Sequence, residues 1–516
     1  MATQWGEGYV TDLEYTAGYY RELNPSLLRF ACLHAGIEPP PAGPLNYLEL
    51  GFGQGLSLNI HAAACPGTYW GTDFNPAHTA RAAQFTDPQD ASIRLLNDSF
   101  SELQARSDLP DFDVIALHGV WSWISDANRR AIVDIARRKL KVGGILSVSY
   151  NCDPGWAALQ PLRHLIYLHT QMGTAPAGGL AASVDQALAF SSKLEKAGAL
   201  YFRNNPQVGP FLQAISAMDR KYLVHEYLGE DWQPMAFSQV VEWFAPARVE
   251  FAASANLLDQ VENLMLNPAG RQLVAETGNR VLRETMRDYL VHQRFRRDIF
   301  VKGLRPLSAV DRLEQLDRQL IVLKSLPSQV PSKIAGPFFE ASLQADVYGL
   351  LVEALASDGH APKTIADLRA RGAARNVSAS HVVEGVAMLV GMGHAVAAEP
   401  ATAESRRRCA ALNRALCERA RRGDEFPCLA SPVAGTGIEV SRLQQCFLLS
   451  LANGATDAVA VARDVWAMLS ALGQSVVKDG KGLEGAEANL AELEKQVAAF
   501  QSERLPLLQS LGVSLA

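Results

Sequence analysis

Short apolar runs alternate with longer amphipathic segments over residues 45–150. The apolar runs predict five strands, because each run is short and ends at glycine or polar residues. These strands cover residues 46–50, 68–72, 93–96, 112–117 and 145–150. Helical patterns lie between them at 56–64, 76–85, 100–106 and 127–140, with Asn75, Ser99 and Asp126 near their starts as caps. The alternation predicts an α/β fold with a Rossmann-like doubly wound sheet.

Helical patterns dominate after residue 155. Residues 156–172, 183–197 and 213–228 predict helices that would form a lid over one edge of the sheet. Three further segments predict strands that return to the sheet, at 237–244, 248–253 and 296–302. An independent helical domain beginning after residue 156 is the alternative, and the pattern favours neither interpretation.

A proline-marked connector at 326–332 precedes a change in pattern. Three short helices and one strand predict a winged-helix-like domain, at 346–355, 364–371, 380–391 and 395–398. Heptad-like spacing at 483–511 predicts a final helix that packs on its own domain or on a partner. We therefore expect an N-terminal helical cap at 1–40, a sheet core at 41–155, a helical lid or regulatory region at 156–325, and a C-terminal winged-helix-like and helical domain at 333–516.

A glycine-rich loop follows the first strand and carries Gly51, Gly53 and Gly55. Glycine allows the backbone to approach a ligand closely, and Asp73 at the end of the second strand can accept hydrogen bonds from both ribose hydroxyls. The third glycine comes four residues after the first, whereas a dinucleotide fingerprint requires five. Glu49 can face the amino group of a methionine moiety but would repel a pyrophosphate. The pattern therefore favours a nucleoside cofactor, S-adenosylmethionine, over a dinucleotide.

Composition is that of a globular protein. The chain has 516 residues, 48% of them apolar and 20% charged, with a formal charge of -6 that does not suggest nonspecific nucleic-acid binding. Gly480-Lys481-Gly482 lacks the hydroxyl and the glycine spacing of a phosphate-binding loop, which argues against nucleotide hydrolysis. No apolar run reaches bilayer length and the first residues are acidic, so we expect neither a membrane span nor a secretory signal. Seven scattered cysteines without CxxC spacing indicate reduced thiols and a cytoplasmic location.

Arginines cluster at 406–408 and recur at 419, 421 and 422. They could contact phosphates, but no aromatic residues are interleaved with them, so solvated helix faces explain them more simply. We favour a protein-contact or dimerisation role for this region, and a homodimer is expected rather than a nucleic-acid complex.

Five short motifs follow one another over residues 40–150. They are Glu49 to Gly55, Gly71-Thr72-Asp73-Phe74, Asn97-Asp98-Ser99-Phe100, Leu117 to Ile124, and Leu140 to Gly144. Their order resembles class I S-adenosylmethionine-dependent methyltransferases. Further motifs at 14–25, 150–156 and 225–228 resemble the bacterial methyltransferases that carry a methyltransferase regulatory domain. That group includes rickettsial protein-lysine methyltransferases, which act on an outer-membrane protein.

The resemblance implies S-adenosylmethionine as cofactor, S-adenosylhomocysteine as product, and no metal. By this resemblance Asp98 and Ser99 read the adenine. The histidines, including His164 and His169, lack a persuasive set of neighbouring metal ligands. The predicted cofactor-binding residues are Glu49, Gly51, Gly53, Gly55, Asp73, Phe74, Asp98, Ser99, His118 and Tyr15.

The predicted catalytic residues are His118, Tyr150 and Trp121. His118 ends the fourth strand and can act as general base, or it can be a structural histidine that shapes the pocket. Aromatic residues crowd the same edge, and the predicted acceptor-binding residues are Tyr19, Trp123, Asn151 and Trp156. A desolvated aromatic channel would favour a neutral lysine amine, since it disfavours the charged form.

Three functions follow from these patterns. The first is methylation of a protein side chain, with lysine as the preferred acceptor. The second is methylation of a small molecule, a lipid or a cell-envelope sugar. The third is a regulatory protein that binds S-adenosylmethionine without catalysis. Cys152 and Asp153 depart from the residues that commonly follow the fifth strand in the family, which leaves the acceptor open.

Overall fold

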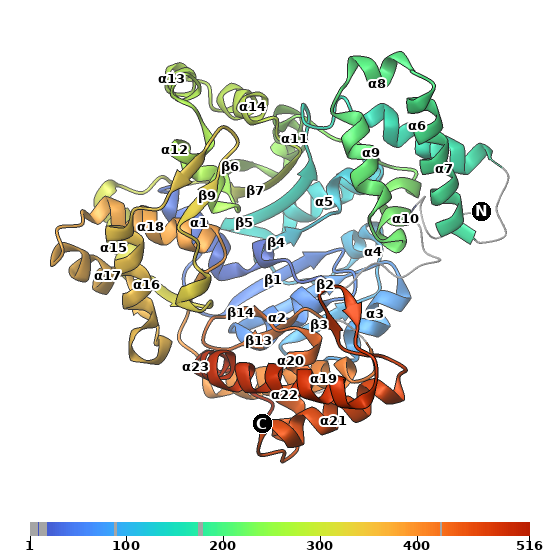
Figure 1. Cartoon of the computed structure of the whole chain (residues 1–516). Helices are drawn as coiled ribbons and strands as arrows, with labels where there is room; N and C mark the ends of the chain where they lie inside the picture. Colours follow the sequence, from blue (N-terminus) through green and yellow to red (C-terminus); the bar gives the residue numbers. More distant parts are fainter. Residues whose placement is uncertain (1–8, 10–17, 87–89, 174–178, 424–425) are drawn as a thin grey trace.

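The computed structural model describes residue 9 and residues 18–86, 90–173, 179–423 and 426–516. At its centre is a seven-stranded mixed sheet with strand order β3-β2-β1-β4-β5-β7-β6 (Figure 1). The strands are β1 (Leu45–Leu50), β2 (Gly67–Thr72), β3 (Ile93–Leu96), β4 (Phe112–Leu117), β5 (Leu140–Asn151), β6 (Val249–Ser254) and β7 (Phe295–Lys302). β1 to β5 are parallel, whereas β7 runs antiparallel to both β5 and β6. The Rossmann-like doubly wound sheet is confirmed.

Consecutive strand residues point to opposite faces of this sheet. Tyr47 packs in one hydrophobic cluster and Leu48 in another, and the same holds for Val114 and Ile115. Because both faces are covered, the central strands β1 and β4 are buried along nearly their whole length, as is typical of parallel sheets. This explains why the sequence pattern located the first five strands well.

Helices and short 3-10 turns lie around the parallel strands. They are η2 (Arg21–Leu23), α1 (Pro25–His34), α2 (Leu56–Ala64), α3 (Pro76–Ala83), α4 (Phe100–Ala105), η3 (Trp121–Trp123) and α5 (Asp126–Lys139). A polar side chain caps the start of α1, α3, α4 and α5. Asn75 and Ser99 cap α3 and α4 as expected, whereas Ser125 rather than Asp126 caps α5. β5 begins directly after α5, so Gly143 and Gly144 lie inside this strand at its bulged start.

A group of helices with its own hydrophobic cluster lies beyond one edge of the sheet (green in Figure 1). These are α6 (Gln160–Met172), α7 (Gly179–Lys196), α8 (Leu200–Asn204), α9 (Val208–Ser216) and α10 (Arg220–Leu228). The single helix expected at 213–228 is broken, because the side chain of Asp219 accepts hydrogen bonds from Lys221 N and Tyr222 N and so starts a new helix. We call α6 to α10 the lid.

The chain then returns to the sheet. The strand expected at 237–244 is instead the helix α11 (Phe237–Phe244), and that prediction is wrong. Phe237, Val240 and Phe244 are buried at helical spacing, a signal that the alternation of apolar residues obscured. β6 and β7 occupy the other two expected positions, so the chain after residue 156 is not an independent helical domain. η4 (Ala245–Ala247) lies between α11 and β6. Between β6 and β7 lie η5 (Leu257–Gln260), α12 (Glu262–Met265), α13 (Pro268–Glu276) and α14 (Arg280–Val291).

The C-terminal part begins with α15 (Ala309–Asp317) and β8 (Leu320–Leu323). It continues with η6 (Pro327–Gln329), β9 (Lys333–Ala335), β10 (Glu340–Ser342), α16 (Ala345–His360), β11 (Lys363–Thr364), α17 (Ile365–Ala373), α18 (Ala379–Gly391) and β12 (Ala395–Ala398). The expected three helices and strand are present. β8 lies between β11 and β12 and precedes the helices in the chain, whereas a winged helix completes its sheet after the third helix. The winged-helix prediction is therefore not confirmed.

The last elements pack against the sheet rather than apart from it. They are α19 (Ala403–Ala420), β13 (Cys428–Ser431), β14 (Thr436–Glu439), α20 (Arg442–Ala452), α21 (Ala458–Ala471), β15 (Val477–Lys478), β16 (Lys481–Gly482), α22 (Ala486–Ala499), the π-helical turn η7 (Phe500–Arg504) and α23 (Leu505–Ser510). α19 and the β13–β14 hairpin contact α2, and residues of both share one hydrophobic cluster with one face of the sheet (orange in Figure 1). α22, the longest part of the helix expected at 483–511, packs on α21 within the C-terminal part.

Candidate functional site

A cavity of about 520 Å³ opens at the carboxyl ends of the parallel strands, between the sheet and the lid. Ligands of doubly wound sheets bind at this edge, where the loops after the strands converge. Twelve of the predicted site residues line the cavity: Glu49, Gly51, Gly53, Gly55, Asp73, Phe74, Asp98, Ser99, His118, Trp123, Asn151 and Trp156. We call this space the strand-edge cavity.

The glycine loop has the backbone that only glycine adopts without strain. Gly51, Gly53 and Gly55 have φ angles of 74°, 58° and 73°. A Cβ at Gly51 would lie 2.7 Å from Val120 Cγ2, and one at Gly55 would lie 2.5 Å from Ala82 Cβ. A Cβ at Gly53 would meet nothing within 4 Å, so this glycine leaves open space on the cavity wall.

Asp73 is held firmly at the end of β2. Its carboxylate accepts hydrogen bonds from Gly53 N at 2.8 Å and Asn75 N at 3.0 Å, and His78 Nδ1 lies 3.1 Å away. The residue is 6% exposed and faces the strand-edge cavity. The carboxylate is thereby fixed in one orientation, as recognition of a ribose diol requires.

Glu49 and Asp98 complete the acidic side of the cavity. Burial raises the pKa of Glu49 to about 8, while a hydrogen bond from Tyr47 opposes and the charge of Asp73 adds to this shift. A ligand ammonium beside Glu49 would favour its charged form. Asp98 pairs with Arg106 at 2.9 Å, and Ser99 caps α4. These residues therefore fit the ribose, adenine and methionine ends of S-adenosylmethionine.

His118 lies in an aromatic setting. Its ring stacks on Tyr20 at 4.1 Å between centroids and meets Phe295 edge-on at 5.7 Å. Burial lowers the pKa of His118 to about 4, with Glu22 opposing this shift and Arg297 adding to it. The imidazole is therefore neutral near neutral pH, and its conjugate acid is a strong acid for a histidine.

Three of the described residues that were predicted for the site are not brought to the cavity. Trp121 is fully buried against Phe244, with ring centroids 4.5 Å apart. The hydroxyl of Tyr150 donates to Asp298 at 2.6 Å inside the sheet, and Tyr19 contacts His61 and Thr436 on the side of the C-terminal part. The apolar environment that suggested a channel is core packing at these three positions. Tyr15 lies outside the described residues.

The lid supplies wall residues that the sequence patterns did not single out. They come from α9 and α10 and include Phe211, Met218, Tyr222, His225, Glu226 and Tyr227. Burial raises the pKa of Glu226 to about 7, partly offset by Arg163, and burial together with the charge of Glu226 raises the pKa of Tyr222 to about 12. Residues 225–228 form a motif that carries the family resemblance, but nothing in the spacing of that motif indicates that its side chains face the strand edge.

Two stretches of the chain match known families. Residues 48–144 match a methyltransferase domain, and residues 219–302 match the predicted methyltransferase regulatory domain. The uncharacterized protein sll1526 of Synechocystis is 34% identical over 515 residues, which cover 99% of this chain and 100% of that protein. The chain belongs to the class I S-adenosylmethionine-dependent methyltransferases with a methyltransferase regulatory domain. Its cofactor is S-adenosylmethionine, and the non-catalytic alternative is set aside.

The similarity to a solved structure covers nearly the whole chain. PKMT2 from Rickettsia typhi in complex with AdoHcy superposes with a TM-score of 0.68 at 17% identity, covering 97% of this chain and 100% of that one. The uncharacterized protein RP789 of Rickettsia prowazekii is 25% identical over 307 residues, covering 56% of this chain and 53% of that protein. The fold is therefore shared from the lid to the C-terminal part, beyond the two matched domains.

Other features of the methyltransferase bear on its chemistry. All seven cysteines are buried free thiols. The described residues contain no group of three or more His, Cys, Asp or Glu side chains arranged to hold a metal ion. In the same part of the chain, no helix combines the length and the apolar content needed to cross a bilayer.

Proposed function

We propose that this methyltransferase transfers the methyl group of S-adenosylmethionine to the side-chain amine of a lysine in a protein substrate. S-adenosylmethionine supplies a methyl group that is already activated on a sulfonium. The protein must therefore hold the acceptor in line, exclude water and remove a proton from the acceptor ammonium.

The cofactor-binding half of the proposal rests on the strand-edge cavity. Asp73 holds the ribose hydroxyls, Asp98 and Ser99 read the adenine, and Glu49 faces the amino group of the methionine moiety. Gly53 lets the backbone approach the ligand, and Phe74 closes the cavity beside the adenine. Charge, the fixed orientation of Asp73 and the open space at Gly53 support the roles of Glu49, Asp73 and Gly53. The roles of Asp98 and Ser99 are those that the resemblance to class I methyltransferases implies.

The acceptor half rests on Glu226. Four carboxylates among the described residues line the cavity, and Glu49, Asp73 and Asp98 come from the strand ends, whereas Glu226 comes from the lid. Aromatic residues share the cavity with this lid carboxylate: Tyr222, Tyr227, Trp123 and Trp156 line it as well. An aromatic wall with one carboxylate attracts a cationic side chain and strips its water. Glu226 is the single observation that carries the lysine proposal.

The same carboxylate is the better base. Moving a proton from a lysine ammonium with a reference pKa of about 10.4 to Glu226 costs about 5 kcal/mol, given its pKa of about 7. Transfer to His118 costs about 9 kcal/mol, because its pKa is lowered to about 4. We therefore propose Glu226 as the general base and His118 as a residue that shapes the pocket, through its stacking on Tyr20.

The resemblance to rickettsial protein-lysine methyltransferases supports a protein acceptor. Trp123, Asn151 and Trp156 would then position the lysine stem and the adjoining peptide, because all three line the cavity between the strand ends and the lid.

A transfer assay tests this function. The purified protein is incubated with tritiated S-adenosylmethionine and a proteome extract, and the label is followed in protein bands and in the organic extract. Label in protein that yields methyl-lysine on acid hydrolysis is expected. Label confined to the organic phase would refute the proposal and indicate a lipid or small-molecule acceptor. Asp73→Asn serves as the control that loses transfer to every acceptor.

A further inference from the structure

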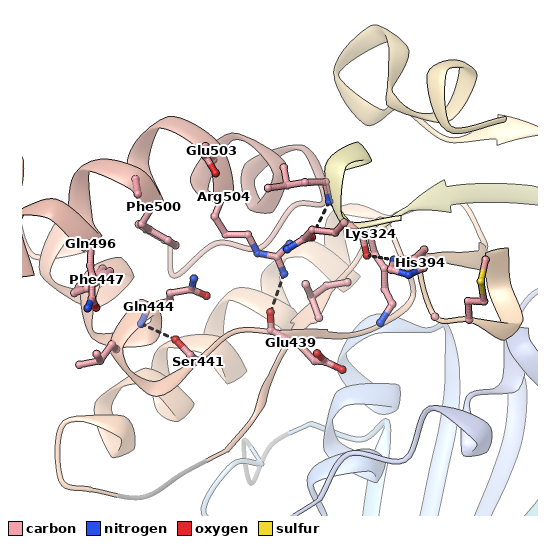
Figure 2. A pocket seen from close by; sticks show the side chains of 18 of the residues that line it. Lys324, His394, Glu439, Ser441, Gln444, Phe447, Gln496, Phe500, Glu503 and Arg504 are labelled. Carbon is pink, nitrogen blue, oxygen red and sulfur yellow. Dashed lines mark hydrogen bonds between the residues drawn. The ribbon is translucent and has the colours of Figure 1, made fainter. Parts of the chain in front are cut away.

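A second and larger cavity, of about 790 Å³, lies where the C-terminal helices meet the start of the chain. Its walls come from η2, the end of β8, the turn after α18, β14, α20 and η7. Figure 2 shows Arg504 reaching from the terminal helix toward Lys324 and His394, with Glu439 nearby. We call this space the C-terminal cavity. Neither matched family domain extends to these helices.

The more buried charged side chains of the C-terminal cavity are cationic. Arg21, Lys324 and Arg504 are half-buried, whereas the two lining carboxylates, Glu439 and Glu503, are exposed. Within the described residues, the ammonium of Lys324 has no hydrogen bond or ion pair, while Arg504 donates to the backbone oxygen of Glu439 at 2.8 Å. Burial lowers the pKa of Lys324, and Arg21 and Arg504 add to this shift while Glu439 opposes it. A partly dehydrated cation cluster of this kind gains from an anion.

Part of the wall of the C-terminal cavity is apolar. The half-buried side chains of Leu326, Met392 and Leu443 form this part. Phe447 and Phe500 lie beneath it, nearly fully buried, and meet at 5.6 Å in a T-shaped arrangement. The volume is within the range of small-molecule sites, in which an apolar surface carries the body of the ligand and a few polar groups orient it.

We propose that the C-terminal cavity is a second ligand site, for a small organic anion with a flat apolar body. A phosphate or carboxylate group binds Lys324 and Arg504, and the body lies against Leu326, Met392 and Leu443, which cover the buried rings of Phe447 and Phe500. This site is separate from the strand-edge cavity, and its occupancy does not depend on which acceptor is methylated.

Occupancy of the C-terminal cavity is coupled to the cofactor site through η2. Arg21 lines the C-terminal cavity and donates to Val390 O at 3.1 Å and to Gly391 O at 2.6 Å. Tyr20, the preceding residue, lines the strand-edge cavity and stacks on His118. An anion that draws Arg21 toward Lys324 would shift Tyr20 and so change the affinity for S-adenosylhomocysteine. The coupling is reciprocal, because each ligand must then change the affinity of the other by the same factor.

Binding is tested on the full-length protein with its cofactor site saturated by S-adenosylhomocysteine. Phenyl phosphate and benzoate are titrated by ligand-observed NMR, and inorganic phosphate serves as the anion without an apolar body. We expect at least one aromatic anion to bind more tightly than inorganic phosphate, and the stronger of the two identifies the charged group. Lys324→Gln and Arg504→Gln should each weaken binding about tenfold, the usual effect of losing a charge-assisted contact.

Lys495→Gln is the matched control. Lys495 is an exposed lysine of α22 outside the C-terminal cavity, so its loss changes the net charge equally without touching the site. Unchanged affinity in both cavity variants, or equal affinity for inorganic phosphate and the aromatic anions, would overturn the proposal. Retained S-adenosylhomocysteine binding verifies that each variant is folded, and Arg504→Gln decides alone if Lys324→Gln fails this check.

Coupling is measured separately, as the affinity of the wild-type protein for S-adenosylhomocysteine with and without saturating aromatic anion. A shift that Lys324→Gln abolishes is expected. An unchanged affinity would refute the link through η2, whatever the acceptor proves to be.

Discussion

Replacing Glu226 by Gln should lower activity and raise stability at the same time. Glu226 is half-buried in the wall of the strand-edge cavity, and desolvation raises its pKa from 4.5 to about 7. A raised pKa in the folded state means that the folded protein binds more protons than the unfolded chain between these two values. The contribution of Glu226 to stability is therefore fully present below pH 4.5 and is lost as the pH rises through 7.

The size of this loss follows from the shift. A difference of 2.5 pKa units corresponds to about 3 kcal/mol of differential free energy between the two protonation states. Glutamine carries no titrating proton. The stability advantage of Glu226→Gln over wild type should therefore grow by about this amount as the pH rises from 4.5 to 8. Thermal unfolding of both proteins at pH 5 and pH 8 measures the trend, with a larger gain in Tm at pH 8.

The methyl-transfer rate of Glu226→Gln should fall, in contrast to its stability. Removal of a general base costs about a hundredfold or more in rate, and the wild-type rate should rise with pH through about 7 as Glu226 ionises. The variant should lack this rise and should approach wild type only near the pKa of free lysine. Initial rates of S-adenosylhomocysteine formation from pH 6 to 10 provide the profile.

Glu230→Gln is the control for both measurements, since Glu230 is exposed and does not line the cavity. The reasoning is refuted if Glu226→Gln keeps the wild-type pH profile, or if its change in Tm is the same at both pH values.

Three further predictions concern the cofactor site and the sheet. Asp73→Asn should weaken S-adenosylhomocysteine binding at least about tenfold in calorimetry, because it loses a charged acceptor for the ribose; retained affinity would place the ribose elsewhere. Gly53→Ala should weaken the same binding, since φ is +58° and the methyl enters the cavity, whereas Gly473→Ala, with φ +67° and open surroundings, should affect stability alone. Arg296→Met should cost about 3 to 5 kcal/mol of unfolding free energy by leaving Asp288 and Asp298 buried without their cation. The exposed pair of Arg305 with Glu38 should contribute less than about 1 kcal/mol, so an equal loss of Tm in Arg305→Met would contradict this ranking.

The parallel strands and the glycine loop were predictable for a local reason. The central strands β1 and β4 are buried, mostly apolar runs, and the positive φ angles of Gly51, Gly53 and Gly55 restrict those positions to glycine. The same locality explains the caps at Asn75 and Ser99, whose side chains bond to their own helices. Predictions failed where one apolar pattern is compatible with two kinds of element. At 237–244 the pattern was interpreted as a strand, but Phe237, Val240 and Phe244 form the buried face of a helix.

The aromatic residues show the same limit within the site. Trp121 and Trp123 are two residues apart in a single turn, yet Trp121 is buried against Phe244 and Trp123 lines the strand-edge cavity. Tyr19 and Tyr20 are adjacent and face different parts of the molecule. A sequence pattern can predict that an aromatic side chain is buried, but it does not predict which residues the ring packs against.

The sequence by itself determined the doubly wound sheet, the cofactor class and the acidic residues at the strand ends, because these depend on short-range patterns and on the order of the strands. The tertiary structure alone decided which lid residues complete the cavity. It also decided between returning strands and an independent helical domain after residue 156, and it placed Lys324 and Arg504 around the same cavity as Arg21, more than 300 residues away in the chain. Such contacts depend on how separate elements pack, which no local pattern records.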